Sequence, residues 1–182
     1  MEKQRIILAA EQSIAREVAL GVTVTRPSSI WHAMIPFMFI FDFLKRTGTI
    51  RRYSQKFMFP RRHALLAAVD ITRGEGTEGP LKSSNLQSSG LPKNQMALVN
   101  LLKDHYVKLL EVDGDTYGSL VRNAYRDRGD YEAFLSRLAQ AEMEVVRVVI
   151  ESSGERSKLR EIKLAEQVQL EKQRKKRIDE IF

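Results

Sequence analysis

The sequence of 182 residues contains no cysteine. This absence excludes disulfide bonds, thiolate zinc sites, cysteine-ligated iron–sulfur clusters and a cysteine nucleophile. It is consistent with a reducing compartment, so we expect a cytoplasmic location, with membrane association as one option. The chain also lacks any run of about 18 uncharged apolar residues, and it therefore predicts no ordinary transmembrane helix. No secretory signal is legible in residues 1–11.

Motifs for catalysis and ligand binding are equally scarce. The only histidines are His32, His63 and His105, and none has the spacing of a helical zinc or di-iron site. No Walker A sequence and no G-x-S-x-G sequence occurs. Residues 74–79 match G-x-G-x-x-G, but no amphipathic helix is predicted after them, so we interpret them as loop. We predict no catalytic residue, no metal site and no cofactor.

Carboxylates are missing from one long stretch of the chain, because none occurs between Asp42 and Asp70. Residues 1–62 contain 11 Lys and Arg against 4 Asp and Glu, whereas residues 63–182 contain 19 of each sign. The formal net charge of +7 is therefore located entirely in the first third of the sequence. This excess of positive charge predicts an anionic partner for the first third of the chain.

The most unusual stretch spans residues 30–62 and is called here the apolar–basic segment. Its first part, residues 30–44, contains four of the eight phenylalanines and the only tryptophan. Its second part contains seven Lys and Arg between Lys45 and Arg62. We expect contact with a membrane surface or a partner subunit through an aromatic and cationic set: Trp31, Phe37, Phe39, Phe41, Lys45, Arg46, Arg51, Arg52, Lys56, Arg61 and Arg62.

Three interpretations of the apolar–basic segment remain open. A helix that is apolar all round is typical of the centre of a bundle, which would leave only a basic surface beside it. Aromatic residues followed by cations also suit an anionic membrane, where each Lys or Arg contributes about 1 kcal/mol. The same cations, mixed with Tyr53 and Phe57, suit phosphate contacts and base stacking, although no nucleic-acid-binding motif is legible.

The spacing of apolar residues predicts an all-α fold: a helical bundle of five to seven helices, with a long internal loop and an extended charged C-terminal helix. We expect Gly21 to end the first helix and Pro60 to occupy the first turn of another. Asn94 and Asp115 are the expected N-caps of later helices. The expected helices cover residues 2–20, 30–46 with a kink at Pro36, 60–71, 94–112, 115–125 and 131–151, and residues 50–58 form a short basic helix or loop.

The expected organisation has four parts. Residues 1–71 form the N-terminal helices, residues 72–94 a flexible loop that is the main internal boundary, and residues 95–151 the continuation of the bundle. Residues 155–182 form a charged helix that projects from the body or pairs with a partner helix, which allows self-association.

The function expected from these observations is that of a non-enzymatic association or adaptor protein. It would dock on a membrane surface or a partner subunit through residues 30–62. The alternative is a helical nucleic-acid-binding protein that uses the same basic patch. The second alternative is an enzyme with a helical pocket that uses His63 or His105 together with Asp70 or Asp104.

Overall fold

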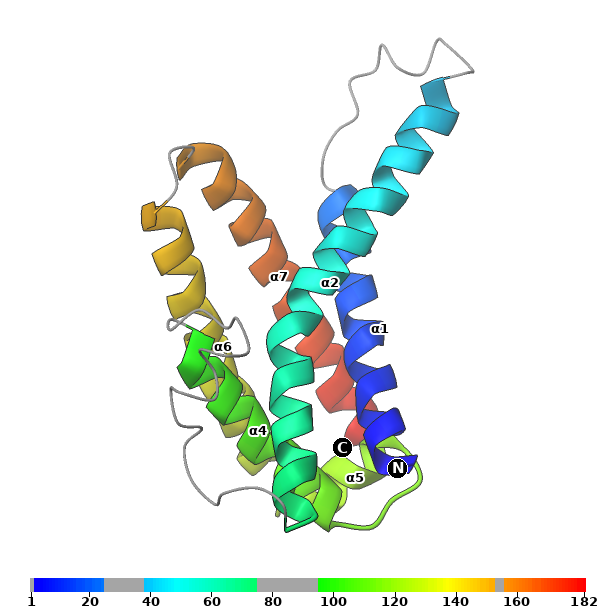
Figure 1. The fold of residues 1–182 in the computed structure, drawn as a ribbon, viewed down its shortest axis with the longest axis vertical. Helices are drawn as coiled ribbons and strands as arrows, with labels where there is room; N and C mark the ends of the chain where they lie inside the picture. The colour runs from blue at the N-terminus through cyan, green and yellow to red at the C-terminus, as the bar shows by residue number, and fades with distance from the viewer. Residues whose placement is uncertain (1, 25–37, 75–94, 153–155) are drawn as a thin grey trace.

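The computed structural model describes residues 2–24, 38–74, 95–152 and 156–182 (Figure 1). Six helices and no strand occur in these ranges, which confirms the all-α prediction. The helices are α1 (Glu2–Val24), α2 (Met38–Thr72), α4 (Met96–Glu111), α5 (Tyr117–Ala124), α6 (Arg128–Ser152) and α7 (Arg156–Ile181).

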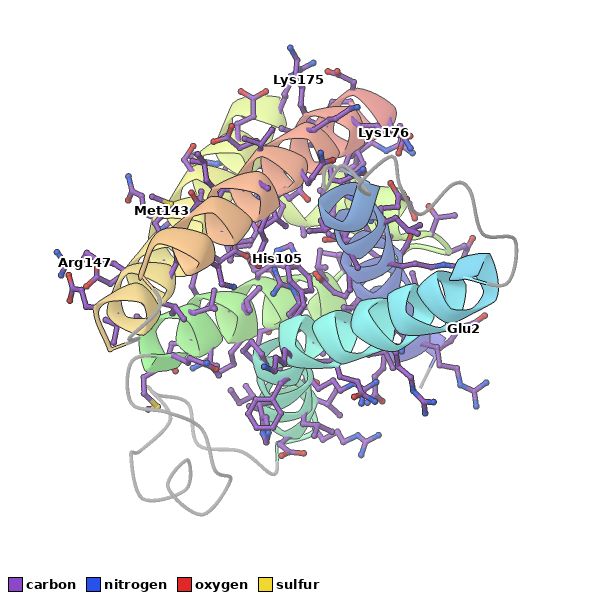
Figure 2. All side chains as sticks on the ribbon, turned by 90° about the horizontal axis from the view of Figure 1, so that it is seen from above. Glu2, His105, Met143, Arg147, Lys175 and Lys176 are labelled. Carbon is purple, nitrogen blue, oxygen red and sulfur yellow. The ribbon has the colours of Figure 1, made fainter. Side chains whose placement is uncertain are left out.

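Five of the helices form a closed ring. Around the ring, α2 packs on α4, α4 on α6, α6 on α7, α7 on α1, and α1 on α2 (Figures 1 and 2). The short helix α5 contacts α4, α7 and α1, and it closes the end of the bundle at which both termini lie (Figure 1). A ring of this kind buries one stripe of each helix in a shared interior.

One core joins both halves of the chain. It contains buried apolar side chains from all six helices, among them Ile7 of α1, Leu65 of α2 and Leu102 of α4. Residues 75–94, most of the predicted loop and boundary, lie outside the described residues, but the core continues across them. The helices on the two sides of these residues therefore share one core, as expected if residues 95–151 continue the bundle.

The C-terminal helix differs from the prediction, because α7 does not project from the body. Its residues Leu170, Ile178 and Ile181 are buried, and it packs on α1 and α6. Charged residues lie beside these apolar positions in the sequence, and most of them, such as Lys172, Lys175 and Asp179, are exposed. A sparse apolar stripe was sufficient for packing because three neighbouring helices cover it.

The middle of the N-terminal half also differs from the prediction. A single helix, α2, runs through Thr47, Gly48 and Pro60. We expected one helix to end before Thr47 and another to begin at Pro60. Packing explains the continuity, since Phe57 and Met58 before Pro60, and Ala64 and Leu65 after it, are all buried. This burial outweighs the loss of one backbone hydrogen bond at the proline. Pro36, the predicted kink, lies outside the described residues.

Several predicted helix ends also shift. Gly21 lies inside α1, where an added Cβ would come within 2.5 Å of the Gln169 side chain of α7, so glycine permits this close approach. Thr116, not Asp115, caps α5: its hydroxyl accepts from the Ser119 backbone N–H at 3.1 Å, and the Ser119 hydroxyl binds the Thr116 backbone N–H. Gln95 precedes α4 without a side-chain cap, and Asn94 lies outside the described residues.

Core packing gives a first prediction. Leu109 is fully buried in α4, so Leu109→Ala should lower the free energy of unfolding by about 2–5 kcal/mol through lost transfer energy and a new cavity. Urea unfolding followed by circular dichroism measures this change. Leu164→Ala on the exposed side of α7 is the matched control and should change stability by less than about 0.5 kcal/mol. Equal losses in both variants would contradict the described core.

Candidate functional site

The cations of the apolar–basic segment divide between two environments. Arg51, Lys56 and Arg62 are exposed on α2. Arg61, in contrast, is only 5% exposed and lies in the interior. The prediction that Arg61 contributes to a contact surface is therefore wrong, because its guanidinium is enclosed by other helices.

The remaining predicted contact residues are described less completely. Trp31 and Phe37 lie outside the described residues. Five more belong to α2, but the structure describes only their backbone: Phe39, Phe41, Lys45, Arg46 and Arg52. The N-terminal turns of α2, which carry most of this set, extend beyond the end of α1 in Figure 1.

Two large apolar side chains are exposed beside the outward cations of α2. Phe59 is 40% exposed and Leu66 is 55% exposed. Phe59, Arg62 and Leu66 follow one another at three- and four-residue spacing, so they lie on one side of the helix. We call the set of Arg51, Lys56, Phe59, Arg62 and Leu66 the outward face of α2. Residues 43–69 contain no carboxylate, but Asp70 of α2 is exposed four residues after Leu66 and adds one negative charge to this side of the helix.

The inward side of α2 is organised by a chain of four charged residues, called here the buried ion chain. Arg61 Nε donates to Glu11 Oε2 of α1 at 2.9 Å, and Arg61 Nη2 donates to Glu142 Oε1 of α6 at 2.7 Å. The second carboxylate oxygen of Glu142 accepts from Arg174 Nη2 of α7 at 2.5 Å. Four helices are thus joined through alternating charges, all of them largely buried.

Further contacts hold Arg61 in place. Its guanidinium carbon lies 3.6 Å from the centre of the Phe57 ring, and Nη1 donates to the Phe57 carbonyl at 3.2 Å. Burial alone would lower the pKa of Arg61, but the carboxylates of Glu11 and Glu142 outweigh it and raise the pKa above the ordinary arginine value. Arg61 therefore remains charged in the interior.

An aromatic cluster surrounds His105 next to the buried ion chain, and Figure 2 shows this histidine in the middle of the bundle. Its Nδ1 lies 2.7 Å from the Tyr125 hydroxyl, and its Nε2 lies 3.3 Å from the Tyr117 hydroxyl. The ring stacks on Phe134 with centroids 4.3 Å apart. Burial, with smaller effects of Lys108 and Arg177, lowers the pKa of His105 to about 3. The neutral ring donates to one tyrosine and accepts from the other.

A small cavity of about 30 Å³ lies between the ion chain and the aromatic cluster. Its polar lining includes Glu11, Arg61, His105, Arg174 and Arg177. A cavity of this size holds about two water molecules, which excludes an organic substrate.

The histidine–aspartate pairs considered for an enzyme are not assembled. Both ring nitrogens of His105 are occupied by tyrosine hydroxyls, while Asp104 is exposed and pairs with Lys103 at 3.3 Å. His63 packs edge-on against Phe59, with ring centroids 4.7 Å apart. No group of histidine and carboxylate side chains suited to a metal ion occurs in the described part of the chain.

The sequence reasoning missed the buried ion chain, although its members carry a signal. Glu11 continues the spacing of Ile7, Ala15 and Val18, all of which are fully buried. Arg61 likewise lies four residues after Phe57 and three before Ala64. Glu142 lies four residues after Leu138, and Arg174 lies four residues after Leu170 and four before Ile178, so both have the same signal. A charged residue in line with apolar positions is a candidate for a buried ion pair, but the spacing does not say which residue is its partner.

The ion chain gives a second prediction. Glu142→Gln should lower the free energy of unfolding by about 3–5 kcal/mol. The reason is that Arg61 and Arg174 both lose a carboxylate partner in the interior. Glu144→Gln is the matched control on the same helix, since Glu144 and its partner Arg147 are exposed. That control should cost less than about 1 kcal/mol in chemical unfolding. Similar losses for the two variants would rule out the buried arrangement.

His105 gives a third prediction. Between pH 6.5 and about 3 the unfolded chain binds a proton at this position and the folded chain does not, so stability falls as pH falls through this range. Unfolding measured at pH 6.5 and 5 should show a loss of about 2 kcal/mol from this group.

The variant that isolates this effect is His105→Gln, because the amide still pairs with tyrosine hydroxyls and does not titrate. It should lose less stability than the wild type between the two pH values. His63→Gln is the control and should keep the pH dependence of the wild type. An unchanged dependence in His105→Gln would contradict a neutral buried histidine.

None of the helices in the described ranges is both long enough and apolar enough to cross a bilayer. Comparison of the chain with protein-family models, with curated protein sequences and with solved structures finds no match. Its function must therefore be argued from the outward face of α2 and from the polar interior.

Proposed function

We propose that this protein is a non-enzymatic association protein that docks on an anionic membrane surface through the outward face of α2. The observation that supports this most directly is the exposure of Phe59 and Leu66 beside the exposed cations Lys56 and Arg62. Apolar and cationic side chains on one side of a helix match the two layers of an anionic interface, its headgroups and its acyl boundary.

Charge supports an anionic partner. Arg51, Lys56 and Arg62 lie on a helix that has no carboxylate between Asp42 and Asp70. Each cation near an anionic lipid surface contributes about 1 kcal/mol, so these three contribute about 3 kcal/mol at low salt. Arg61 does not contribute to this attraction, because its charge is buried and paired with Glu11 and Glu142.

Apolar exposure supports a membrane over a purely electrostatic partner. Phe59 and Leu66 would each transfer apolar surface from water to the interface. The N-terminal turns of α2 add a sequence that is rich in phenylalanine, residues 38–44, on backbone that extends past α1 (Figure 1).

The nucleic-acid alternative loses one of its expected contacts. Phe57, considered for base stacking, is buried, and its ring is covered by the Arg61 guanidinium. The exposed cations of α2 remain suited to phosphate, but stacking is the term that favours single-stranded nucleic acid over other anions. Nucleic-acid binding is therefore kept as an outcome of the test below.

The fourth prediction concerns vesicle binding. The triple variant Arg51→Glu, Lys56→Glu and Arg62→Glu should bind vesicles of mixed phosphatidylserine and phosphatidylcholine on the order of a hundredfold more weakly than the wild type. The reason is the loss of about 3 kcal/mol of attraction. Co-sedimentation at low and high salt measures the partition, and circular dichroism checks that the helices remain.

The matched control moves the same charge change to other surfaces. Arg122→Glu, Lys172→Glu and Lys175→Glu replace three exposed cations on α5 and α7 and should retain most of the binding. Equal losses in both triple variants would mean that net charge, not the outward face of α2, drives association. Binding of the wild type to duplex or single-stranded DNA with no binding to vesicles would overturn the membrane proposal in favour of nucleic acid.

A further inference from the structure

The outer side of α7 presents three large apolar side chains to solvent. Leu164 is 63% exposed, Val168 is 55% exposed and Phe182 is 42% exposed. Phe182 directly follows α7, and its backbone N–H donates to the Ile178 carbonyl at 3.0 Å, so it continues the hydrogen-bond pattern of the helix. Within the described ranges, no other helix exposes as many large apolar side chains.

Two exposed charged residues, Glu171 and Lys175, lie between these apolar positions. Because an α-helix turns by about 100° per residue, positions 164, 168, 171, 175 and 182 fall within about 60° of its circumference. We call these five residues the outer stripe of α7. Figure 2 shows Lys175 on the outer side of the bundle.

Neither charge of the outer stripe is neutralised by the described part of the chain. Glu171 precedes Lys175 by four residues, a spacing and order at which glutamate and lysine can pair on a helix. None of the ion pairs that α7 makes within the described residues includes either of them. Their neighbours do pair, since Lys176 lies 3.9 Å from Glu17 and Asp179 lies 3.0 Å from Arg128.

The order of residues along the outer stripe is self-complementary. Apolar residues lie at its two ends, and one charge of each sign lies between them. If a second copy of α7 runs antiparallel, Glu171 faces Lys175 of that copy and Leu164 faces its Phe182, because both pairs are centred on position 173. A parallel copy would instead bring equal positions together, and like charges would repel each other.

We propose that two copies of this chain associate through their outer stripes, antiparallel and related by a two-fold axis at position 173. The dimer has two Glu171–Lys175 ion pairs at its centre, and Leu164, Val168 and Phe182 meet at each end. The contact covers about 27 Å of helix, so the interface is small and the dimer forms only at micromolar concentration or above. The outer stripe and the outward face of α2 lie on different helices, so this proposal does not rest on membrane docking.

Charge reversal tests the central ion pairs. Sedimentation equilibrium of the full chain at low salt, from about 1 μM to about 1 mM, should show conversion of monomer to dimer. Glu171→Lys should raise the dissociation constant on the order of tenfold, because two opposite-charge contacts become two like-charge contacts. Lys175→Glu should raise it similarly. Asp70→Lys changes the charge of an exposed position on α2 by the same amount as Glu171→Lys and should leave the dissociation constant unchanged.

Mixing the two reversed chains tests their complementarity. Glu171→Lys and Lys175→Glu shift the net charge in opposite directions, so a nonspecific charge effect would not weaken both. An equimolar mixture should associate more tightly than either variant alone, because opposite charges face each other again. A wild type that stays monomeric, a dimer that neither reversal weakens, or a mixture that associates no better than its components would each overturn the proposal.

Disulfide trapping tests the antiparallel register, since the chain has no cysteine of its own. Leu164→Cys mixed with Phe182→Cys should form a mixed disulfide under mild oxidation, because these positions face each other in the dimer. Leu164→Cys alone is the control and should not form one, because its two copies lie about 27 Å apart along the helix axis. Trapping of Leu164→Cys with itself, or no trapping in the mixture, would contradict the antiparallel pair.

Discussion

The buried ion chain of Glu11, Arg61, Glu142 and Arg174 is the constraint on which the arrangement of this bundle depends. It joins α1, α2, α6 and α7 through alternating charges in an interior where an unpaired charge would be strongly destabilising. The chain is satisfied at only one rotation of α2 about its axis. That rotation directs Arg61 inward and consequently places Phe59, Arg62 and Leu66 on the outside.

The outward face of α2 and the polar interior are thus two consequences of one helix orientation. Adjacent arginines in the sequence, Arg61 and Arg62, have opposite environments because successive residues of a helix point about 100° apart. The first is neutralised by two carboxylates, and the second remains exposed beside apolar side chains. A cationic block in the sequence is therefore partly a core feature and partly a surface feature.

Much of the fold follows from local pattern. The all-α class and the extents of α4 and α6 are readable because apolar residues recur at three- and four-residue spacing over long stretches. The continuity of α2 through Gly48 and Pro60 is not readable, since it depends on burial of Phe57 and Ala64 against other helices. The docking of α7 is likewise decided by tertiary contacts, because the charged sequence of α7 contains few apolar positions.

Less of the candidate site could be predicted. The sequence indicates a cationic and aromatic segment, but it does not show which of its side chains are exposed. Of Phe57, Arg61 and Arg62, only Arg62 is exposed. Pairing of Arg61 with Glu142 joins positions 81 residues apart, and no local pattern specifies such a contact. The tyrosine partners of His105 lie outside α4, Tyr117 in α5 and Tyr125 just after it, and the cavity beside them exists only in the assembled bundle.

The most direct test of the account uses the absence of cysteine, which allows a single thiol to be introduced and labelled. Phe59→Cys on α2 and Gln140→Cys on the exposed side of α6 would each carry an environment-sensitive fluorophore. With anionic vesicles, the emission at position 59 should shift to the blue and become protected from aqueous quenchers, while position 140 should not change. An unchanged emission at position 59, or equal shifts at both positions, would contradict docking through the outward face of α2.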